Sequence, residues 1–215
     1  DNYQAAAKIA PADPQYVFAQ GFLEASRGRY PQATTLYLES LKIDSTFDKS
    51  LAQLHDLYLT HYENEEEAMQ FNARLLRNHP GHALGRFQEG NYYLREALNI
   101  MGMNQLKAFE NYVNEAVSAY SIAVNRDPNL TQAWYNRGYC YFLGNGREGA
   151  AVEDFEKCLE LDPDYAPAHF MIGSIFEKNG DLQTALKRYE NAAQLDPGSK
   201  DYRKAVKEVR AQLNG

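Results

Sequence analysis

The feature that most constrains this chain of 215 residues is an internal repeat. Segments that end in Asp-Pro, or in a similar turn, recur at six positions: Pro11, Ser45, Pro80, Pro128, Pro163 and Pro197. The steps between them are 34, 35, 48, 35 and 34 residues. A separate series keeps the same register: Ala33, Ala68, Ala116, Ala151 and Ala185. Because independent series stay in step, the sequence predicts a row of similar structural units.

Each unit is predicted to contain two helices. In the unit at 166–199, Ile172 and Phe176 repeat with helical spacing, a turn follows at 179–181, and a second apolar stripe ends before Pro197. Small residues recur in the first helix at Gly21, Gly90, Gly138 and Gly173, with His55 in the same register. We expect them to let two helices approach closely. Aromatic rings recur in the second helix and should fill the gaps: Tyr37, Tyr120, Phe155 and Tyr189.

These motifs resemble the tetratricopeptide repeat. The resemblance rests on Trp134, Gly138, Ala151 and Phe155 followed by Leu-Asp-Pro at 161–163, and it recurs in the next unit. It covers nearly the whole chain. It implies an all-α fold, a right-handed α-solenoid of tetratricopeptide helix pairs that forms an α-α superhelix.

The resemblance divides the chain into seven segments. Residues 1–12 are expected to be the second-helix remnant of a preceding repeat, which indicates a cut from a longer protein or a short helix that caps the stack. Residues 200–215 are expected to be a capping helix with a solvated cationic face. Between them we expect five repeats: 14–47, a degenerate repeat at 48–82 in which His55 and Asn72 replace the glycine and the aromatic residue, 83–130 with an elongated helical hairpin, 131–165 and 166–199.

The unit at 83–130 is the most individual. Gly90 and Ala116 are 26 residues apart, against 12 for Gly21 and Ala33, and the 14 extra residues keep a helical period. We expect two lengthened helices joined by a turn at Gly102, with Asn104 as the N-cap of the second. Apolar residues near the tip predict a contact with a partner or with a second copy: Leu98, Met101, Met103 and Leu106.

Composition excludes several classes of function. The chain carries 29 acidic and 22 basic residues, a net charge of −7, whereas nucleic-acid-binding domains usually have a basic surplus. No apolar stretch reaches the ~18 residues of a membrane span. We therefore expect a soluble protein with no nucleic-acid partner. Two cysteines fit a reducing cytoplasm without excluding a periplasm, so the compartment stays open.

No catalytic motif is recognisable. His79 and His82 flank a turn, but zinc sites normally need three or four ligands. Cys140 and Cys158 lie in helix stripes, where cysteine is usually a small buried hydrophobe. The acidic run at 63–67 is expected at a helix start, where the helix dipole favours carboxylates. We predict a non-catalytic protein with no cofactor and no metal.

The resemblance implies that first helices line a concave, peptide-binding face. Gln53, Gln88 and Asn136 are equivalent in three repeats, and amides can both donate to and accept from a peptide backbone. Aromatic side chains beside them would add apolar contacts. The predicted groove comprises Phe18, Phe22, Gln53, Phe87, Gln88, Asn91, Gln132, Tyr135, Asn136, Tyr139 and Phe170.

One branch of the family binds the C-terminal carboxylate of chaperones through a Lys/Asn/Arg clamp. Asn91 and Asn136 match its two asparagines, but Phe87 stands in place of the lysine and Met171 in place of the arginine. A carboxylate without those cations loses its main partners. The classical clamp is therefore incomplete, and this ligand is disfavoured.

Three functions remain after these exclusions. The first is a protein-protein interaction scaffold that binds an extended peptide or partner segment in its concave groove. The second is a structural assembly subunit that uses its convex face and the protruding 83–126 hairpin, including for self-association. The third is a regulatory arm of a larger protein. The sequence does not name the partner.

Overall fold

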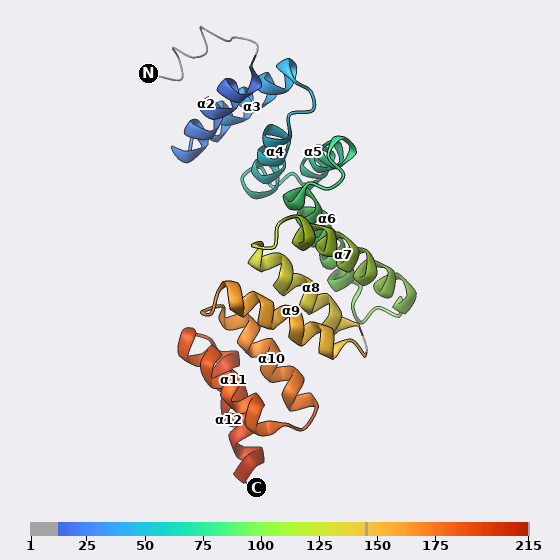
Figure 1. Cartoon of the computed structure of the whole chain (residues 1–215), viewed down its shortest axis with the longest axis vertical. Helices are drawn as coiled ribbons and strands as arrows, with labels where there is room; N and C mark the ends of the chain where they lie inside the picture. The colour runs from blue at the N-terminus through green and yellow to red at the C-terminus, as the bar shows by residue number, and fades with distance from the viewer. Residues whose placement is uncertain (1–12, 145, 215) are drawn as a thin grey trace. The chain divides into compact units, whose positions relative to one another are not determined.

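The computed structural model describes residues 13–144 and 146–214, and these residues form helices and no strand (Figure 1). The predicted all-α class is therefore confirmed. The expected helical remnant at residues 1–12 lies outside the described residues. The chain divides into two compact units, residues 1–88 and residues 89–215.

Consecutive helices pair within each unit. The first unit contains α2 (Pro14–Ser26), α3 (Tyr30–Ile43), α4 (Asp48–Thr60), α5 (Glu65–Asn78) and the start of α6 (Ala83–Ile100). The second contains the rest of α6, α7 (Leu106–Arg126), α8 (Thr131–Leu143), α9 (Glu148–Leu161), α10 (Ala166–Lys178), α11 (Leu182–Leu195) and α12 (Lys200–Asn214). Helix α2 packs on α3, α4 on α5, α8 on α9, and α10 on α11.

A glycine facing an aromatic ring sets the spacing within most pairs. A Cβ atom added to Gly173 in α10 would lie 2.7 Å from Cδ1 of Tyr189 in α11, closer than side chains tolerate. The ring of Tyr189 is almost fully buried. Equivalent contacts join three other pairs: Gly21–Tyr37, Gly90–Tyr120 and Gly138–Phe155. The prediction that small residues permit close helix approach is confirmed.

The pair α4–α5 reverses this arrangement. The large side chain, His55, lies in the first helix and the small one, Asn72, in the second, and both are buried. The His55 Nδ1 atom donates to the Ala68 carbonyl at 2.8 Å, since a carbonyl can only accept. The Asn72 amide donates across to the Gly85 carbonyl at 3.0 Å. Each polar side chain therefore joins two helices where other pairs use an apolar ring.

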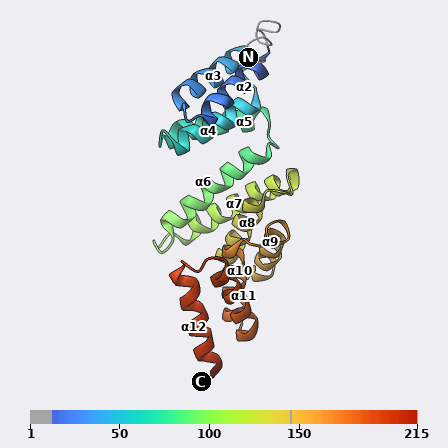
Figure 2. The same ribbon diagram turned by 90° about the vertical axis from the view of Figure 1, so that its left-hand side faces the viewer.

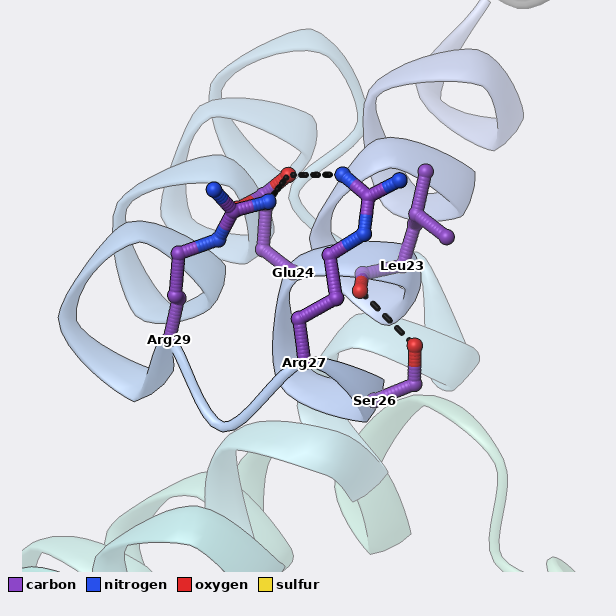
Figure 3. Close-up of polar contacts among 5 residues, drawn as sticks. All are labelled: Leu23, Glu24, Ser26, Arg27 and Arg29. Atoms are coloured by element: carbon purple, nitrogen blue, oxygen red, sulfur yellow. Dashed lines mark hydrogen bonds and ion pairs between the residues drawn. The ribbon is translucent and has the colours of Figure 1, made fainter.

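The turn between α2 and α3 shows how a pair is closed (Figure 3). Gly28 has φ +73°, a left-handed conformation that ends α2 and that glycine adopts without strain. Glu24 pairs with both Arg27 and Arg29 across the turn. The Ser26 hydroxyl donates to the Leu23 carbonyl at 2.8 Å. The Ser26 bond provides a hydrogen-bond donor for a carbonyl in the last turn of α2, and the ion pairs hold side chains together across the turn.

Helix α12 packs along α11 at the C-terminal end of the described chain (Figure 2). Val209 is fully buried, and Val206 and Leu213 pack beside it against the cluster that contains Tyr189. The basic residues of α12 are exposed: Lys200, Arg203, Lys204, Lys207 and Arg210. Arg210 forms an ion pair with Glu190 of α11. One face of this helix is apolar and covered, and the other is charged and solvated.

Helices α6 and α7 are longer than the rest, with 18 and 21 residues, whereas the paired helices around them have 13 or 14. They are joined by a turn in which Gly102 has φ +84°, as expected. The expectation that Asn104 is the N-cap of α7 is wrong. The N-cap is Gln105, whose side chain makes no capping bond. The residues before α7 form a turn with its own backbone hydrogen bonds, such as that from Met103 N–H to the Ile100 carbonyl. The helix therefore begins at Leu106, one residue later than an Asn104 cap would give.

Substitution of Gly173 by alanine tests the close approach. The added methyl group would overlap Tyr189, so Gly173→Ala should lower the free energy of unfolding by about 1–3 kcal/mol. Gly149→Ala is the matched control, because a Cβ there meets no atom within 4 Å. Since alanine favours helix, it should be neutral or stabilise by up to about 1 kcal/mol. Urea unfolding followed by circular dichroism measures both, and equal effects would contradict the packing argument.

Acidification should weaken the α4–α5 pair. Burial lowers the pKa of His55 below its ordinary value of 6.5, so the folded chain favours the neutral form. The stability due to this shift is complete above pH 6.5 and is lost as the pH falls toward the folded pKa. His82 and His169 have pKa values lowered by burial and contribute in the same direction.

The variant His55→Gln isolates the contribution of this residue. It should be less stable than the natural chain at neutral pH, with a difference that narrows as the pH falls below 6.5. Chemical unfolding midpoints measured across that range test this. Parallel pH profiles for the two proteins would show that His55 does not titrate in this way.

Candidate functional site

In the second unit, amide side chains from two successive first helices meet. The Asn136 Nδ2 group of α8 donates to the Asn91 Oδ1 atom of α6 at 2.9 Å. The Tyr120 hydroxyl of α7 donates to the same oxygen at 2.7 Å. The aromatic ring that packs against Gly90 thus also fixes the polar side chain next to that glycine. One N–H of the Asn136 amide is committed to this contact.

Aromatic side chains continue this contact toward α12. The ring centroids of Tyr135 in α8 and Tyr165, which precedes α10, are 5.2 Å apart. Those of Phe170 in α10 and Tyr202 in α12 are 5.0 Å apart. Burial, and then the phenols of Tyr165 and Tyr202, raises the pKa of Tyr135, which therefore stays neutral. We call these residues the polar–aromatic strip: Asn91, Tyr135, Asn136, Tyr165, Phe170 and Tyr202.

Four members of the strip were candidate groove residues, and two were not. The structure places Asn91, Asn136, Tyr135 and Phe170 half-buried along it. Tyr139 is half-buried beside Phe142, and Gln132 is exposed. Sequence reasoning missed Tyr165 and Tyr202. Tyr165 could have been found from its position in the turn before α10. Tyr202 could not, because it lies in α12, which has no equivalent in the other repeats.

The other candidate groove residues belong to the first unit. Phe18 is half-buried, with its ring 5.5 Å from that of Tyr37, whereas Phe22 is 55% exposed. Gln53 and Phe87 are half-buried. Gln88 is buried, and its Oε1 atom has no hydrogen-bond partner among the described residues. The three amides that the sequence treats as equivalent, Gln53, Gln88 and Asn136, therefore have different surroundings.

A partly buried ion pair joins α8 to α9 and was also missed from sequence. Arg137 of α8 donates two hydrogen bonds of 2.7 Å to the buried carboxylate of Asp154 in α9. Its guanidinium carbon lies 4.8 Å from the ring centroid of Trp134. Such bidentate pairing fixes the geometry of both helices. It orients α8, the helix that carries Tyr135 and Asn136.

The hairpin residues are exposed as predicted. Met101 and Met103 are each 54% exposed, Leu106 is 69% exposed and Leu98 is 36% exposed. The turn between α6 and α7 holds a hollow of about 410 Å³, lined by three of them, Met101, Met103 and Leu106. The contact expected at this surface stays a prediction.

The residues considered for chemistry have structural surroundings. Cys140 and Cys158 are buried free thiols, and burial raises the pKa of each to about 12. The His79 side chain contacts the Thr46 carbonyl, and His82 lies 3.8 Å from the Asp48 carboxylate. Over 13–144 and 146–214, no group of three or more His, Cys, Asp or Glu residues is arranged to bind a metal ion. Within the same ranges, no helix has the length and apolar character to cross a membrane.

Two family models, both described as tetratricopeptide repeat, match residues 131–165 and residues 155–187. The chain is a tetratricopeptide-repeat protein. Solved structures of this fold are similar along most of its length. The structure of TTC0263, a thermophilic TPR protein of Thermus thermophilus, has a TM-score of 0.59 and 21% identity, covering 92% of this chain and 99% of that one.

Two other solved structures give the same result for the fold. MamA has a TM-score of 0.60 and 19% identity, covering 82% of this chain and 94% of that one. YrrB, described as a TPR protein with an unusual peptide-binding site, has a TM-score of 0.59 and 20% identity, covering 96% and 98%. At these identities the likeness shows the tetratricopeptide fold.

Curated relatives are longer than this chain. Hsp70-Hsp90 organizing protein 3 of Arabidopsis thaliana is 35% identical over 101 residues, which are 46% of this chain and 18% of the relative. DnaJ homolog subfamily C member 7 of Homo sapiens is 26% identical over 213 residues, 97% of this chain and 42% of the relative. The chain thus spans less than a fifth of the first relative and less than half of the second.

The Arg137–Asp154 pair gives a stability prediction. Asp154→Ala leaves a partly buried guanidinium without its carboxylate and should lower the free energy of unfolding by about 3–5 kcal/mol. Glu160→Ala is the matched control, since its pair with Lys157 in the same helix is exposed and should change stability little. Thermal and urea unfolding compare the two variants. A small effect of Asp154→Ala would mean that the pair does not orient α8.

Proposed function

We propose that this chain is a non-catalytic scaffold that binds an extended segment of a partner protein on the polar–aromatic strip. Tetratricopeptide repeats and the co-chaperone relatives support a protein-protein interaction scaffold in general. The strip adds a location in the second unit. This proposal narrows the predicted groove to Asn91, Tyr135, Asn136 and Phe170, extended by Tyr165 and Tyr202.

The observation that carries the proposal is the continuity of side chains across successive helices. Asn91 contacts Asn136, Tyr135 contacts Tyr165, and Phe170 contacts Tyr202. An extended peptide laid across these helices would meet amides and phenols, which can bond its backbone. Its apolar side chains would meet aromatic rings, which give large contact areas at low entropic cost. This combination favours a segment bound along its length.

The names of the relatives suggest a peptide segment of another protein as the partner. The residues of this chain change which part of such a segment we expect it to recognise. The relatives of the Hsp70-Hsp90 organizing type are named for two chaperones, and YrrB is described as having a peptide-binding site. In this chain, Phe87 and Met171 stand where the family's clamp has cations, and Met171 is buried. We propose recognition by aromatic and amide contacts along an internal segment, without a requirement for a terminal carboxylate.

A second candidate function is assembly through the hairpin, in which the chain acts as a structural subunit or as a regulatory arm of a larger protein. The observation that favours it is the exposure of Met101, Met103 and Leu106. An exposed apolar patch on a soluble domain usually marks a contact surface. The two candidates use different surfaces of the second unit and can be tested separately.

Selection from a peptide display library tests the strip. Peptides that bind the natural chain should lose about tenfold or more in affinity toward Tyr202→Ala and Asn136→Ala, because both variants remove contact groups from the strip. Affinity measured by fluorescence polarisation should be the same for free and amidated peptide C-termini.

The control is Met103→Ala at the hairpin, which should bind strip-selected peptides unchanged. Circular dichroism establishes that all three variants fold. Affinity that survives both strip substitutions would contradict the proposal, as would a tenfold loss on amidation of the peptide C-terminus.

A further inference from the structure

The tip of the α6–α7 hairpin has a hollow that the strip does not use. It is formed by residues 100–106 and Phe109 and measures about 410 Å³. Cavities of this size accommodate a bulky side chain or a small ligand. Two of the four methionines in the chain, Met101 and Met103, lie at its edge. Methionine adapts its shape to a binding partner, which suits it to such surfaces.

The hollow continues along α7 toward the α8–α9 turn. A second hollow of about 240 Å³ shares Leu106 and Phe109 with the first and is also lined by Asn114 and Arg147. The tip therefore has an apolar part and, beside it, a part with polar groups. Phe109 and Asn114 are five residues apart on one helix, which is about 7.5 Å along its axis.

Arg147 places a cation in the second hollow, which the Glu110 carboxylate also lines. Its guanidinium donates to the neutral Asn114 Oδ1 atom at 3.1 Å. The carboxylate of the adjacent residue, Glu148, pairs with Lys178 instead. Glu110 lines the same hollow without an ion pair to Arg147. A carboxylate of a partner would therefore find a cation whose present partner is uncharged.

The size of the exposed surface argues against a second copy as the occupant. The exposed apolar side chains of the tip are Leu98, Met101, Met103 and Leu106. A stable protein interface buries about 800 Å² and roughly 20–30 residues on each partner. Two tips placed together would fall well short of that. A short segment that inserts a side chain into the hollow buries more area for its length.

We propose that the hairpin tip binds a short amphipathic helix of another protein that carries one bulky apolar anchor and an acidic residue one to two helical turns away. The anchor occupies the hollow between Met101, Met103 and Leu106. The acidic residue pairs with Arg147 beside Asn114. The segment lies along the overhanging part of α7, away from the polar–aromatic strip. This is a second binding site of the chain, and it does not depend on the function proposed for the strip.

The experiment uses a display library of helix-forming peptides and the whole chain labelled with ¹³C at its methionine methyl groups. Peptides are selected on the natural chain after depletion on the double variant Met101→Asp/Met103→Asp. We expect enriched sequences to share an apolar anchor and an acidic residue at the proposed spacing. Their synthetic forms should shift the methyl signals of Met101 and Met103 saturably. Met171, which is buried, should not shift and reports that the fold is intact.

Variants separate the two contacts. The double aspartate variant should lose at least tenfold in affinity, because charged side chains replace the apolar edge of the hollow. Arg147→Gln should lower the affinity for the acidic peptide by about threefold. It should leave unchanged the affinity for a peptide in which glutamine replaces the acidic residue. Lys107→Gln is the matched control: it removes an exposed cation of α7 that lines neither hollow, and affinity should not change.

Three results would overturn the proposal. The first is a selection that yields no peptide dependent on Met101 and Met103. The second is a binder with equal affinity for the natural chain and for Arg147→Gln. The third is a shift of the Met101 and Met103 methyl signals with protein concentration alone, which would make a second copy the occupant.

Discussion

The close approach of a glycine and an aromatic ring is the contact on which four of the described helix pairs depend. Gly21, Gly90 and Gly173 each face a buried ring in the following helix at a distance that leaves no room for a methyl group, and Gly138 faces the buried ring of Phe155 only slightly less closely. Because an interior of this kind is packed as densely as a crystal, the ring fixes both the separation and the rotation of the two helices. Other contacts between the paired helices, such as Arg137–Asp154, add to this constraint.

The strip follows from the repetition of this contact. Equivalent residues recur once per repeat: Tyr135 in α8 and Phe170 in α10 each lie three residues before the glycine of their helix. Asn91 and Asn136 are not equivalent positions, but their side chains, from two successive first helices, bond to each other. The hairpin departs from this regularity because α6 and α7 are longer than the helices around them. Their ends therefore lie beyond the neighbouring pairs and are not covered by them. The exposed methionines occur at that overhang. The regular spacing of the repeats therefore gives rise to the polar–aromatic strip. The lengthened helices, which interrupt that spacing, give rise to the exposed hairpin tip.

The sequence predicted the features that repeat and missed those that depend on a single contact. The glycine and aromatic positions were predictable because steric size recurs in register. The cap of α7 was not, because the turn before it is set by backbone bonds that no side-chain pattern reveals. The pairing of Arg137 with Asp154, and of Asn136 with Asn91, depends on rotamers chosen in three dimensions. Residue types indicate what could bond, but the packed geometry selects the partner.

Tyr120 belongs to the interior and also bonds a residue of the strip. Its ring packs against Gly90, while its hydroxyl bonds the same Asn91 oxygen that receives Asn136. A ligand bound to the proposed strip would contact groups bonded to a ring that packs between two helices. A ligand that binds only the folded chain stabilises it, by about 2.7 kcal/mol at 100 times its Kd. Tension from a bound partner would reach the interior of the α6–α7 pair through one phenol.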